Sequence, residues 1–308
     1  MPKVLILIPL FVSERSLARA HDLLDALIVH ENPDHFEILF VLDGKNRNSF
    51  FLPPRQAHLK IHTTSNPRSH RSNGWSGGLI CGLIRGMKTA LKLGSWDFLL
   101  RIDDDAMVLR PFLTRATRYF AENPNIGQVG FYEFGTPPKP GEYHFFAGPF
   151  YRRSKLIRYH SDVGGLWVSC FGWRRMVRLM INDAVRHGYA HGEFCQGGAF
   201  FLSRASVEAM CRSRYFRNEK IFGGCTFTED FFFAIANRAV GFVPRYVSDE
   251  EHFLSLKWKG LHKVPEQLLA EGHAIVHSVK DDEALEKEAW MRELFRRERE
   301  RSATEAEI

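Results

Sequence analysis

The stretch that decides the fold runs Trp96-Asp97-Phe98-Leu99-Leu100-Arg101-Ile102 and continues into three aspartates, Asp103-Asp104-Asp105. An apolar run of this length, rich in aromatic and branched residues, predicts a buried strand. The aspartates then stand at its carboxyl end, where open α/β sheets bind their ligands. Adjacent carboxylates are costly unless a cation neutralises them, and a hard divalent cation is the natural partner. A solvated acidic loop is the alternative, and the motif alone does not separate the two.

The composition is that of an ordinary globular protein. The chain has 308 residues, of which 44% are hydrophobic and 25% charged, enough for one large α/β domain or two fused halves. The net charge of +6 suits an anionic ligand or an acidic membrane surface. The sequence has no zinc-finger spacing and no basic-aromatic ribbon, which argues against a nucleic-acid partner. Five cysteines without a CxxC pair indicate a reducing compartment, so we expect a cytoplasmic protein. No apolar stretch is long enough to span a bilayer, so any membrane contact would be peripheral, at the inner face.

Strand and helix signals alternate through the first half of the chain, which predicts a parallel sheet with helices on both faces. A break rich in proline and glycine at residues 136–141 separates this half, 1–135, from a less regular half, 136–280. A charged helical tail, 281–308, is expected to be peripheral. The expected strands are 4–8, 36–42, 59–64, 96–102, 126–134, 143–150, 199–202, 242–247 and 274–279, and the expected helices are 15–30, 79–93, 111–122, 173–187, 205 onward and 228–239.

Two further motifs have both a structural and a functional interpretation. Thr228 is a good helix N-cap, and Glu229 and Asp230 in the first turn suit the helix dipole, so capping alone explains them. A carboxylate at a helix start can also face a cleft and act as a general base. Gly197 and Gly198, just before an apolar strand, fit either a simple turn or a place where a ligand approaches the backbone closely.

Later in the chain, one histidine and two lysines are of interest. His277 lies in an apolar strand, where a histidine is usually a satisfied core residue, but it could give a nitrogen to a metal ion held by the aspartates. Lys257 and Lys259 are by default solvated, or they could neutralise a diphosphate from a closing loop. The chain has no Walker loop, GxGxxG or HExxH motif.

In their order along the chain, these motifs resemble the GT-A fold of nucleotide-sugar-dependent glycosyltransferases, in the broad family-2-like group. The resemblance spans residues 3 to 280. It rests on a DxD motif at 103–105, a glycine loop at 197–198, an xED motif at 229–230 and the late histidine, His277. It implies a mostly parallel, Rossmann-like central sheet with helices on both faces and a smaller mixed sheet on the acceptor side. Residues 1–135 would bind the nucleotide sugar, and 136–280 would carry the acceptor site and the catalytic base.

The resemblance also implies donor-binding residues. Pro9, at the end of the first strand, and Asp43 would contact the nucleoside, and Arg68 and Arg71 would hold the base or the phosphates. The other residues assigned to the donor are Asp103, Asp104, Lys257 and Lys259.

The same resemblance implies a metal site and a catalytic pair. Asp105, with Asp103 and His277, would bind Mn or Mg as the cofactor. Asp230 would be the general base of an inverting transfer, while Glu229 orients the acceptor or the sugar. The residues assigned to the acceptor are Gly197, Gly198 and Trp173.

The implied function is transfer of one sugar from a nucleotide diphosphate sugar, expected to be UDP-linked, to a hydroxyl of a glycan or glycolipid. The QxxRW signature of processive synthases is absent, which favours addition of single sugars. A retaining transferase of the same fold stays open, as does a non-catalytic carbohydrate-binding or scaffold protein. A sugar-1-phosphate nucleotidyltransferase is disfavoured because residues 9–15 lack its glycine- and lysine-rich signature. The basic-aromatic segments 150–153 and 173–175 could contact an anionic or lipid-linked acceptor, or be simply solvated.

Overall fold

The computed structural model of the chain describes residues 2–44, 48, 50–51, 53–69, 72, 74–132, 172–281 and 283–306. Four features of the sequence lie outside these residues. They are Arg71, the break at 136–141, the strand expected at 143–150 and the basic-aromatic segment 150–153.

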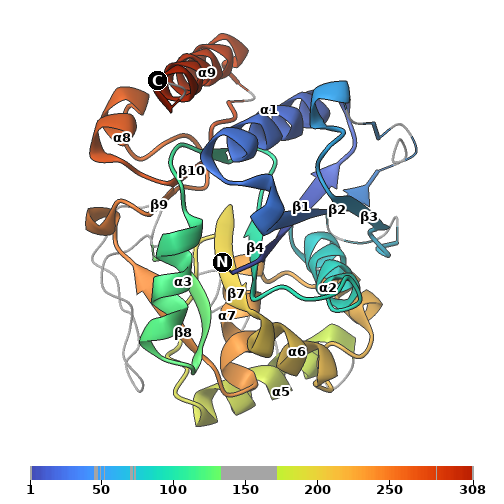
Figure 1. The fold of residues 1–308 in the computed structure, drawn as a ribbon. Helices are drawn as coiled ribbons and strands as arrows, with labels where there is room; N and C mark the ends of the chain where they lie inside the picture. The colour runs from blue at the N-terminus through green and yellow to red at the C-terminus, as the bar shows by residue number, and fades with distance from the viewer. Residues whose placement is uncertain are drawn as a thin grey trace.

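A seven-stranded sheet with the order β3-β2-β1-β4-β7-β6-β8 forms the centre of the molecule (Figure 1). β7 runs antiparallel to both of its neighbours, β4 and β6, and the other neighbouring pairs are parallel. The mostly parallel central sheet expected from the sequence is therefore confirmed. The strands are β1 (Val4–Phe11), β2 (Phe36–Asp43), β3 (Ile61–Ser65), β4 (Phe98–Ile102), β6 (Ile126–Phe131), β7 (Ala199–Ser203) and β8 (Val243–Val247).

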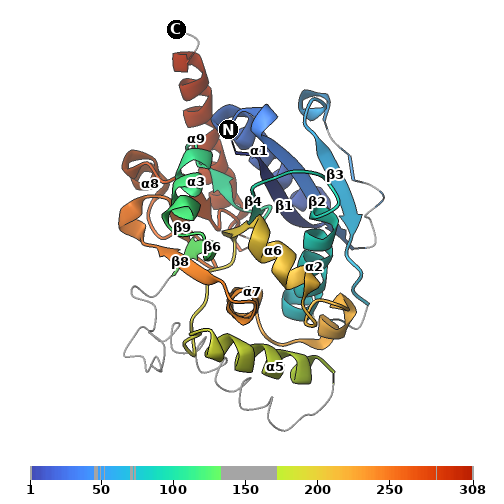
Figure 2. The same ribbon diagram turned by 60° about the horizontal axis from the view of Figure 1, so that its bottom comes forward.

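Helices cover both faces of this sheet, because successive side chains of a strand point to opposite faces. In β1, Val4, Ile6 and Ile8 belong to one hydrophobic core, and Leu5 and Leu7 belong to the other. The first core is covered by α1 (Glu14–His30), α3 (Leu113–Glu122), α8 (Pro265–Glu271) and α9 (Leu285–Ala306). The second core is covered by α2 (Leu79–Ala90), α5 (Gly172–Arg186), α6 (Arg204–Arg212) and α7 (Glu229–Ala239). Figure 2 shows α5 lying along the outside of α7, with which it makes extensive contact.

A second, three-stranded sheet has the order β5-β10-β9. β5 (Met107–Val108) is antiparallel to β10 (Ile275–His277), and β9 (Leu254–Leu256) is parallel to it, so the smaller sheet is mixed, as expected. The three aspartates connect β4 of the large sheet to β5 of the small one. They therefore lie where the chain passes between the two sheets.

β1 is longer than the sequence suggests, because it continues through Pro9 to Phe11. Proline was expected to end the strand, since it cannot donate a backbone hydrogen bond to a sheet. The pairing of β1 with β4 ends at Leu7, whereas its pairing with β2 continues to Phe11. At Pro9 the strand has β2 beside it and is no longer paired with β4, so the missing N–H is tolerated.

The C-terminal helix is not peripheral, which corrects the expectation from its charged sequence. Met291 and Phe295 of α9 are 3% and 1% exposed and join the core beside α1. The buried Arg19 of α1 donates hydrogen bonds to both carboxylate oxygens of Glu288, at 2.7 and 2.5 Å. This ion pair holds the pKa of Glu288 down at about 2, since Arg19 and Arg292 outweigh the effect of burial, which would raise it.

We expect Glu288→Ala to destabilise the protein by about 3 kcal/mol, because it leaves a buried guanidinium without its carboxylate. Glu300→Ala is the matched control, since Glu300 pairs with Arg296 on the exposed side of the same helix, where such pairs contribute less than about 1 kcal/mol. Urea unfolding of the two variants measures the difference. If Glu288→Ala and Glu300→Ala both lower the free energy of unfolding by less than about 1 kcal/mol, α9 does not unfold together with the core.

Candidate functional site

The predicted motifs meet around one buried side chain, Arg101 of β4. Its guanidinium is completely buried, and Nη2 lies 2.9 Å from Asp103 Oδ1 and 3.4 Å from Glu229 Oε1. Across the sheet it packs 5.6 Å from the ring centre of Phe200, its partner in β7. Arg101 thus joins the aspartate turn at the end of β4 to the acid pair at the start of α7.

Asp103, Asp105 and His277 form a group that could hold a metal ion, with ligand atoms that all lie within 4.8 Å of one another. His277 Nε2 is 3.1 Å from Asp105 Oδ1 and 3.6 Å from Asp103 Oδ2. The other ring nitrogen, Nδ1, lies 2.9 Å from the carbonyl oxygen of Lys257, which can only accept a hydrogen bond. When Nδ1 donates there, Nε2 is left as the ligand atom facing the carboxylates. Two carboxylates and an oriented imidazole suit a divalent cation.

The charges around Asp105 favour its ionised form. Asp105 Oδ2 accepts hydrogen bonds from Ser278 Oγ at 2.8 Å and from Lys280 Nζ at 2.9 Å. Burial alone would raise the pKa of Asp105, but His277 and Lys280 outweigh burial and hold it well below its usual value. Burial would likewise lower the pKa of His277, and Asp105 reverses this and raises it.

The two loop glycines lie between the metal-ligand group and the acid pair. A Cβ atom on Gly197 would be 2.4 Å from Asp230 Oδ1 and 2.6 Å from Glu229 Oε1. A Cβ atom on Gly198, whose φ is +98°, would be 2.5 Å from the ring of His277. The carbonyl of Gly198 also accepts a hydrogen bond from the backbone N–H of Asp103 at 2.8 Å. These positions therefore require glycine for close packing, which a simple turn does not explain.

The acid pair lies at the start of α7, mostly hidden from solvent. Asp230 is 6% exposed, and the Glu229 side chain is 14% exposed. Thr228 occupies the N-cap position, but its side chain makes no capping hydrogen bond and instead lies 3.4 Å from Asp230 Oδ2. Burial and then the charge of Asp230 raise the pKa of Glu229 to about 7, against the opposing effect of Arg101. Helix capping therefore does not account for these side chains by itself.

A second group of predicted residues lies at the carboxyl ends of β1 and β2. Arg68 Nε is 2.5 Å from Asp43 Oδ2, and Asn66 Nδ2 is 3.1 Å from the same oxygen. Pro9 lies in β1 opposite Val41 of β2. Since β1, β2 and β4 are parallel, this group and the aspartates share one edge of the sheet, where such sheets bind ligands.

The remaining predicted residues lie around this centre in different ways. Asp104 is partly exposed in the aspartate turn. Lys257 contacts His277 through its backbone. Its N–H donates a hydrogen bond to the carbonyl of His277 at 2.7 Å, and its carbonyl oxygen lies 2.9 Å from Nδ1 of the His277 ring. Lys259 pairs with Glu283 at 2.6 Å on the surface, where the two side chains are 49% and 81% exposed. Trp173, at the start of α5, lies near Gly224, the last residue of η5 (Glu219–Gly224).

The sequence analysis missed Arg101, Asn66, Ser278 and Lys280. One signal could have found Arg101, since an arginine inside an otherwise apolar strand must have a buried partner. The partners of Asn66, Ser278 and Lys280 are set by contacts between distant segments, which leave no local pattern.

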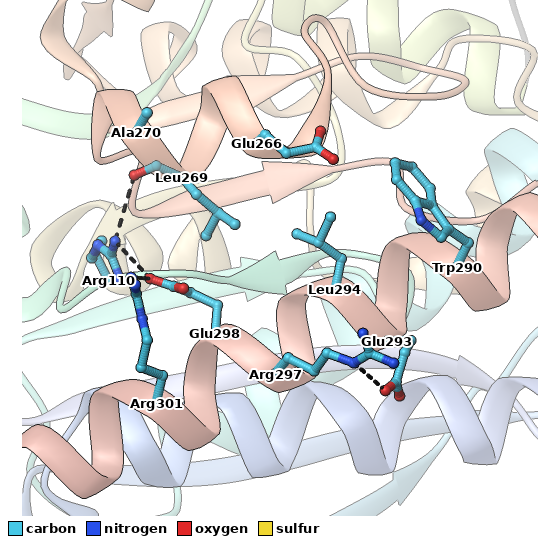
Figure 3. Close-up of a pocket in the computed structure, with 10 residues that line it drawn as sticks. All are labelled: Arg110, Glu266, Leu269, Ala270, Trp290, Glu293, Leu294, Arg297, Glu298 and Arg301. Atoms are coloured by element: carbon cyan, nitrogen blue, oxygen red, sulfur yellow. Dashed lines mark hydrogen bonds and ion pairs between the residues drawn. The ribbon is translucent and has the colours of Figure 1, made fainter.

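A separate groove of about 680 Å³ lies between α8 and α9 (Figure 3). Trp290 and Leu294 of α9 face Leu269 of α8 across it, and Arg110 closes one end by contacts with Leu269 and Glu298. None of the residues predicted to form the donor, acceptor or metal site lines this groove.

The sequence gives no match to protein-family models and none to curated proteins. Among solved structures, the chain is similar to an active-site mutant of LgtC, with 11% identity over 96% of this chain and 94% of that chain and a TM-score of 0.50. The chain has the GT-A fold. It is also similar to the galactosyltransferase LgtC with donor and acceptor sugar analogs (12% identity, 96% of this chain, 95% of that chain, TM-score 0.49).

A third similar structure is the mannosyltransferase PcManGT from Pyrobaculum calidifontis in complex with GDP-Man and Mn2+. The identity is 12%, the TM-score is 0.48, and the match covers 92% of this chain but only 58% of that one. At such identities the likeness concerns the fold. No helix among the described residues is both long and apolar enough to cross a membrane.

Gly198→Ala is expected to weaken Mn2+ binding by about 10-fold or more, because the new methyl group must displace the His277 ring. Gly94→Ala is the matched control: Gly94 has nearly the same φ, +95°, but open space where its Cβ would lie. Both variants should lose about 1 kcal/mol of stability from backbone strain. Isothermal titration with Mn2+ separates them, and equal affinities would contradict the close packing of Gly198 on the metal-ligand group.

The pKa of Glu229 predicts a pH dependence of stability. Its pKa in the folded protein, about 7, lies above the ordinary value of 4.5, so the folded state binds this proton more tightly than the unfolded state does. The contribution of Glu229 to stability is therefore full below pH 4.5 and is lost as the pH rises through 7.

Relative to the wild type, Glu229→Gln should gain up to about 1.4 kcal/mol of stability per pH unit across this window. The exposed Glu266, in the first turn of α8, supplies the control variant Glu266→Gln, which should show no such gain. Urea unfolding from pH 5 to 8 gives the comparison. A constant difference between Glu229→Gln and the wild type would mean that Glu229 does not keep its proton in the fold.

Proposed function

We propose that the protein is a metal-dependent glycosyltransferase that moves a single sugar from a nucleotide diphosphate sugar to a hydroxyl of a glycan or glycolipid. The observation that carries this proposal is the meeting of three motifs at one point. Asp103, Asp105 and His277 lie on one side of the glycine loop, and Glu229 and Asp230 lie on the other. A fold alone does not determine a function, so the proposal rests on these residues.

In this proposal Asp103, Asp105 and His277 hold the divalent ion, which acts as a Lewis acid on the diphosphate leaving group. The imidazole favours Mn2+ over Mg2+, because Mg2+ prefers oxygen ligands in a strict octahedral arrangement. Arg101 pairs with Asp103 and Lys280 pairs with Asp105, which fixes the two carboxylates in position. Residues 1–135 would form the donor half, in which Asp43, with Arg68, and Pro9 contact the nucleoside, expected to be uridine.

The transfer itself would use the acid pair. In an inverting reaction, Asp230 takes the proton of the acceptor hydroxyl as that oxygen bonds to the anomeric carbon, and the electrons of the broken bond leave with the nucleoside diphosphate. Its place at the glycine loop, 6% exposed, supports this role. Glu229, tied to Arg101, would orient the acceptor or the sugar. Gly197 and Gly198 would leave room for the acceptor, with Trp173 further out.

A retaining transferase of the same fold is the second enzyme hypothesis, and NMR of the anomeric proton of the first product distinguishes the two. We also propose a cytoplasmic location, in which a lipid-linked acceptor would be met at the inner face of the membrane. The exposed Arg174 and Arg175, beside Trp173 at the start of α5, are suited to such an anionic partner.

The proposal predicts that one nucleotide and its sugar raise the melting temperature only with a divalent metal. UDP, GDP and CMP, and their common sugars, are each tested with Mn2+, Mg2+ or EDTA. A ligand that binds only the folded state, at 100 times its Kd, stabilises the protein by about 2.7 kcal/mol. Asp105→Ala should abolish the metal-dependent shift, and Asp34→Ala, at an exposed aspartate, should keep it.

Asp230→Asn should keep the donor-induced shift but lower the rate of sugar transfer by about 100- to 10,000-fold, as expected for loss of a general base. If no nucleotide shifts the wild-type melting temperature with any metal, the non-catalytic carbohydrate-binding or scaffold protein becomes the better hypothesis. If Asp230→Asn transfers sugar at the wild-type rate, the base is another group.

A further inference from the structure

Four side chains with metal-binding atoms gather at the edge of the small sheet, apart from the Asp103–Asp105–His277 group. Asp249 begins η6 (Asp249–Glu251), and His252 follows its end. Glu271 is the last residue of α8, and His273 lies just before β10. Figure 1 shows α8 next to β9 and β10, and the four residues come from two connections of the chain, β8 to β9 and α8 to β10. We call this set the 249–273 cluster.

Three members of the cluster, His252, Glu271 and His273, have ligand atoms that all lie within 4.8 Å of one another, and Asp249 adjoins them. His273 Nε2 lies 3.0 Å from Glu271 Oε2 and 3.7 Å from Asp249 Oδ1. His252 Nδ1 lies 3.8 Å from Glu271 Oε2. Zn2+ bound at about 2.0–2.1 Å holds its tetrahedral ligand atoms about 3.3 Å apart. Rotation of these side chains, with movements of their ligand atoms of about 1 Å, would bring His252, Glu271 and His273 into a coordination sphere, and Asp249 would join them from beside His273.

Two of the ligand atoms have no hydrogen-bond partner among the described residues. They are Asp249 Oδ1 and His252 Nδ1, and both are buried atoms that lie within 4 Å of another member of the cluster. Leaving a buried polar atom without a partner costs about 1–3 kcal/mol, so such atoms need an explanation. His252 also has a φ of +49°, in the left-handed region that residues other than glycine seldom adopt. A bound metal ion would give both Asp249 Oδ1 and His252 Nδ1 a partner.

We propose that Asp249, His252, Glu271 and His273 form a second metal site, which takes Zn2+ or a similar divalent ion. Four protein ligands leave no open position for a substrate, so the site would be structural. His273 is completely buried, with Nε2 facing the carboxylates of Glu271 and Asp249. The site would fix the start of β10, the strand that ends in His277. This inference does not depend on the proposed transferase function.

Lys263 provides a way to distinguish a metal site from a plain ion-pair cluster. Its ammonium group lies 2.5 Å from Asp249 Oδ2 and 2.6 Å from Glu271 Oε2. If these are only ion pairs, Lys263 completes them, and its removal leaves carboxylates without a cation. If this is a metal site, Lys263 competes with the metal ion for the same carboxylates. Its side chain is 25% exposed, so it can turn towards solvent when a metal ion binds.

The test is titration of the metal-free full-length protein with Zn2+, followed by calorimetry. We expect two ions per chain, one at each group. Asp105→Ala should remove one of them, and either His252→Gln or Glu271→Gln should remove the other, weakening that site by more than about 100-fold. Lys263→Met should bind the second ion at least about 10-fold more tightly than the wild type.

The matched control is His62→Gln, because His62 also pairs with a glutamate, Glu37, at 3.0 Å but outside the cluster. It should bind two ions, like the wild type. Circular dichroism checks that each variant is folded. If His252→Gln does not fold, Glu271→Gln takes its place in the test. The proposal is overturned if Asp105→Ala binds no Zn2+, if the second ion survives both substitutions in the cluster, or if Lys263→Met binds it no more tightly than the wild type.

Discussion

The buried guanidinium of Arg101 is the constraint on which the rest of the site depends. Four carboxyl groups, those of Asp103, Asp105, Glu229 and Asp230, lie around it at the centre of the fold. Burial alone would lower the pKa of Arg101, but Asp103 and then Glu229 outweigh burial, so the pKa is raised. Removing one member of such a buried pair costs several kcal/mol, since the other charge stays buried. The charge pairs around Arg101 therefore contribute both to the stability of β4 and to the electrostatics of the site.

The position of the metal-ligand group follows from how the two sheets are joined. The aspartate turn leaves β4 and enters β5, and β5 pairs with β10 in an antiparallel register, Val276 opposite Met107. One residue further along β10, this register brings His277 against Asp105. The backbone N–H of Val279 donates to the carbonyl of Asp105 at 2.9 Å, which fixes the same junction from the other side. The ligand geometry is therefore held by backbone pairing, although β5 has only two residues.

The sequence predicts the parts of this structure that local patterns determine. The apolar run before the aspartates gives β4, and helical spacing gives α1 almost to the residue. The order of the acid, glycine and histidine motifs along the chain carries the resemblance to the GT-A fold, and that resemblance predicts that they share one site. Contacts over long sequence separations are not predictable in this way: no local rule pairs Arg101 with Glu229, 128 residues later. In α9, two apolar residues among many charges gave no sign of burial, because only packing against α1 makes that face internal.

The glycine loop has a consequence for how the proposed reaction could be tuned. Gly197 packs on the acid pair and Gly198 on His277, so any side chain on this loop would disturb the proposed catalytic base, Asp230, or the candidate metal-ligand group. If the reaction is the proposed one, this loop leaves little freedom to change the acceptor side. Asp43, Asn66 and Arg68 are different, because they bond to one another at the ends of β2 and β3, outside that packed centre. Recognition of the nucleoside can thus change through these side chains while the geometry around Arg101 stays intact.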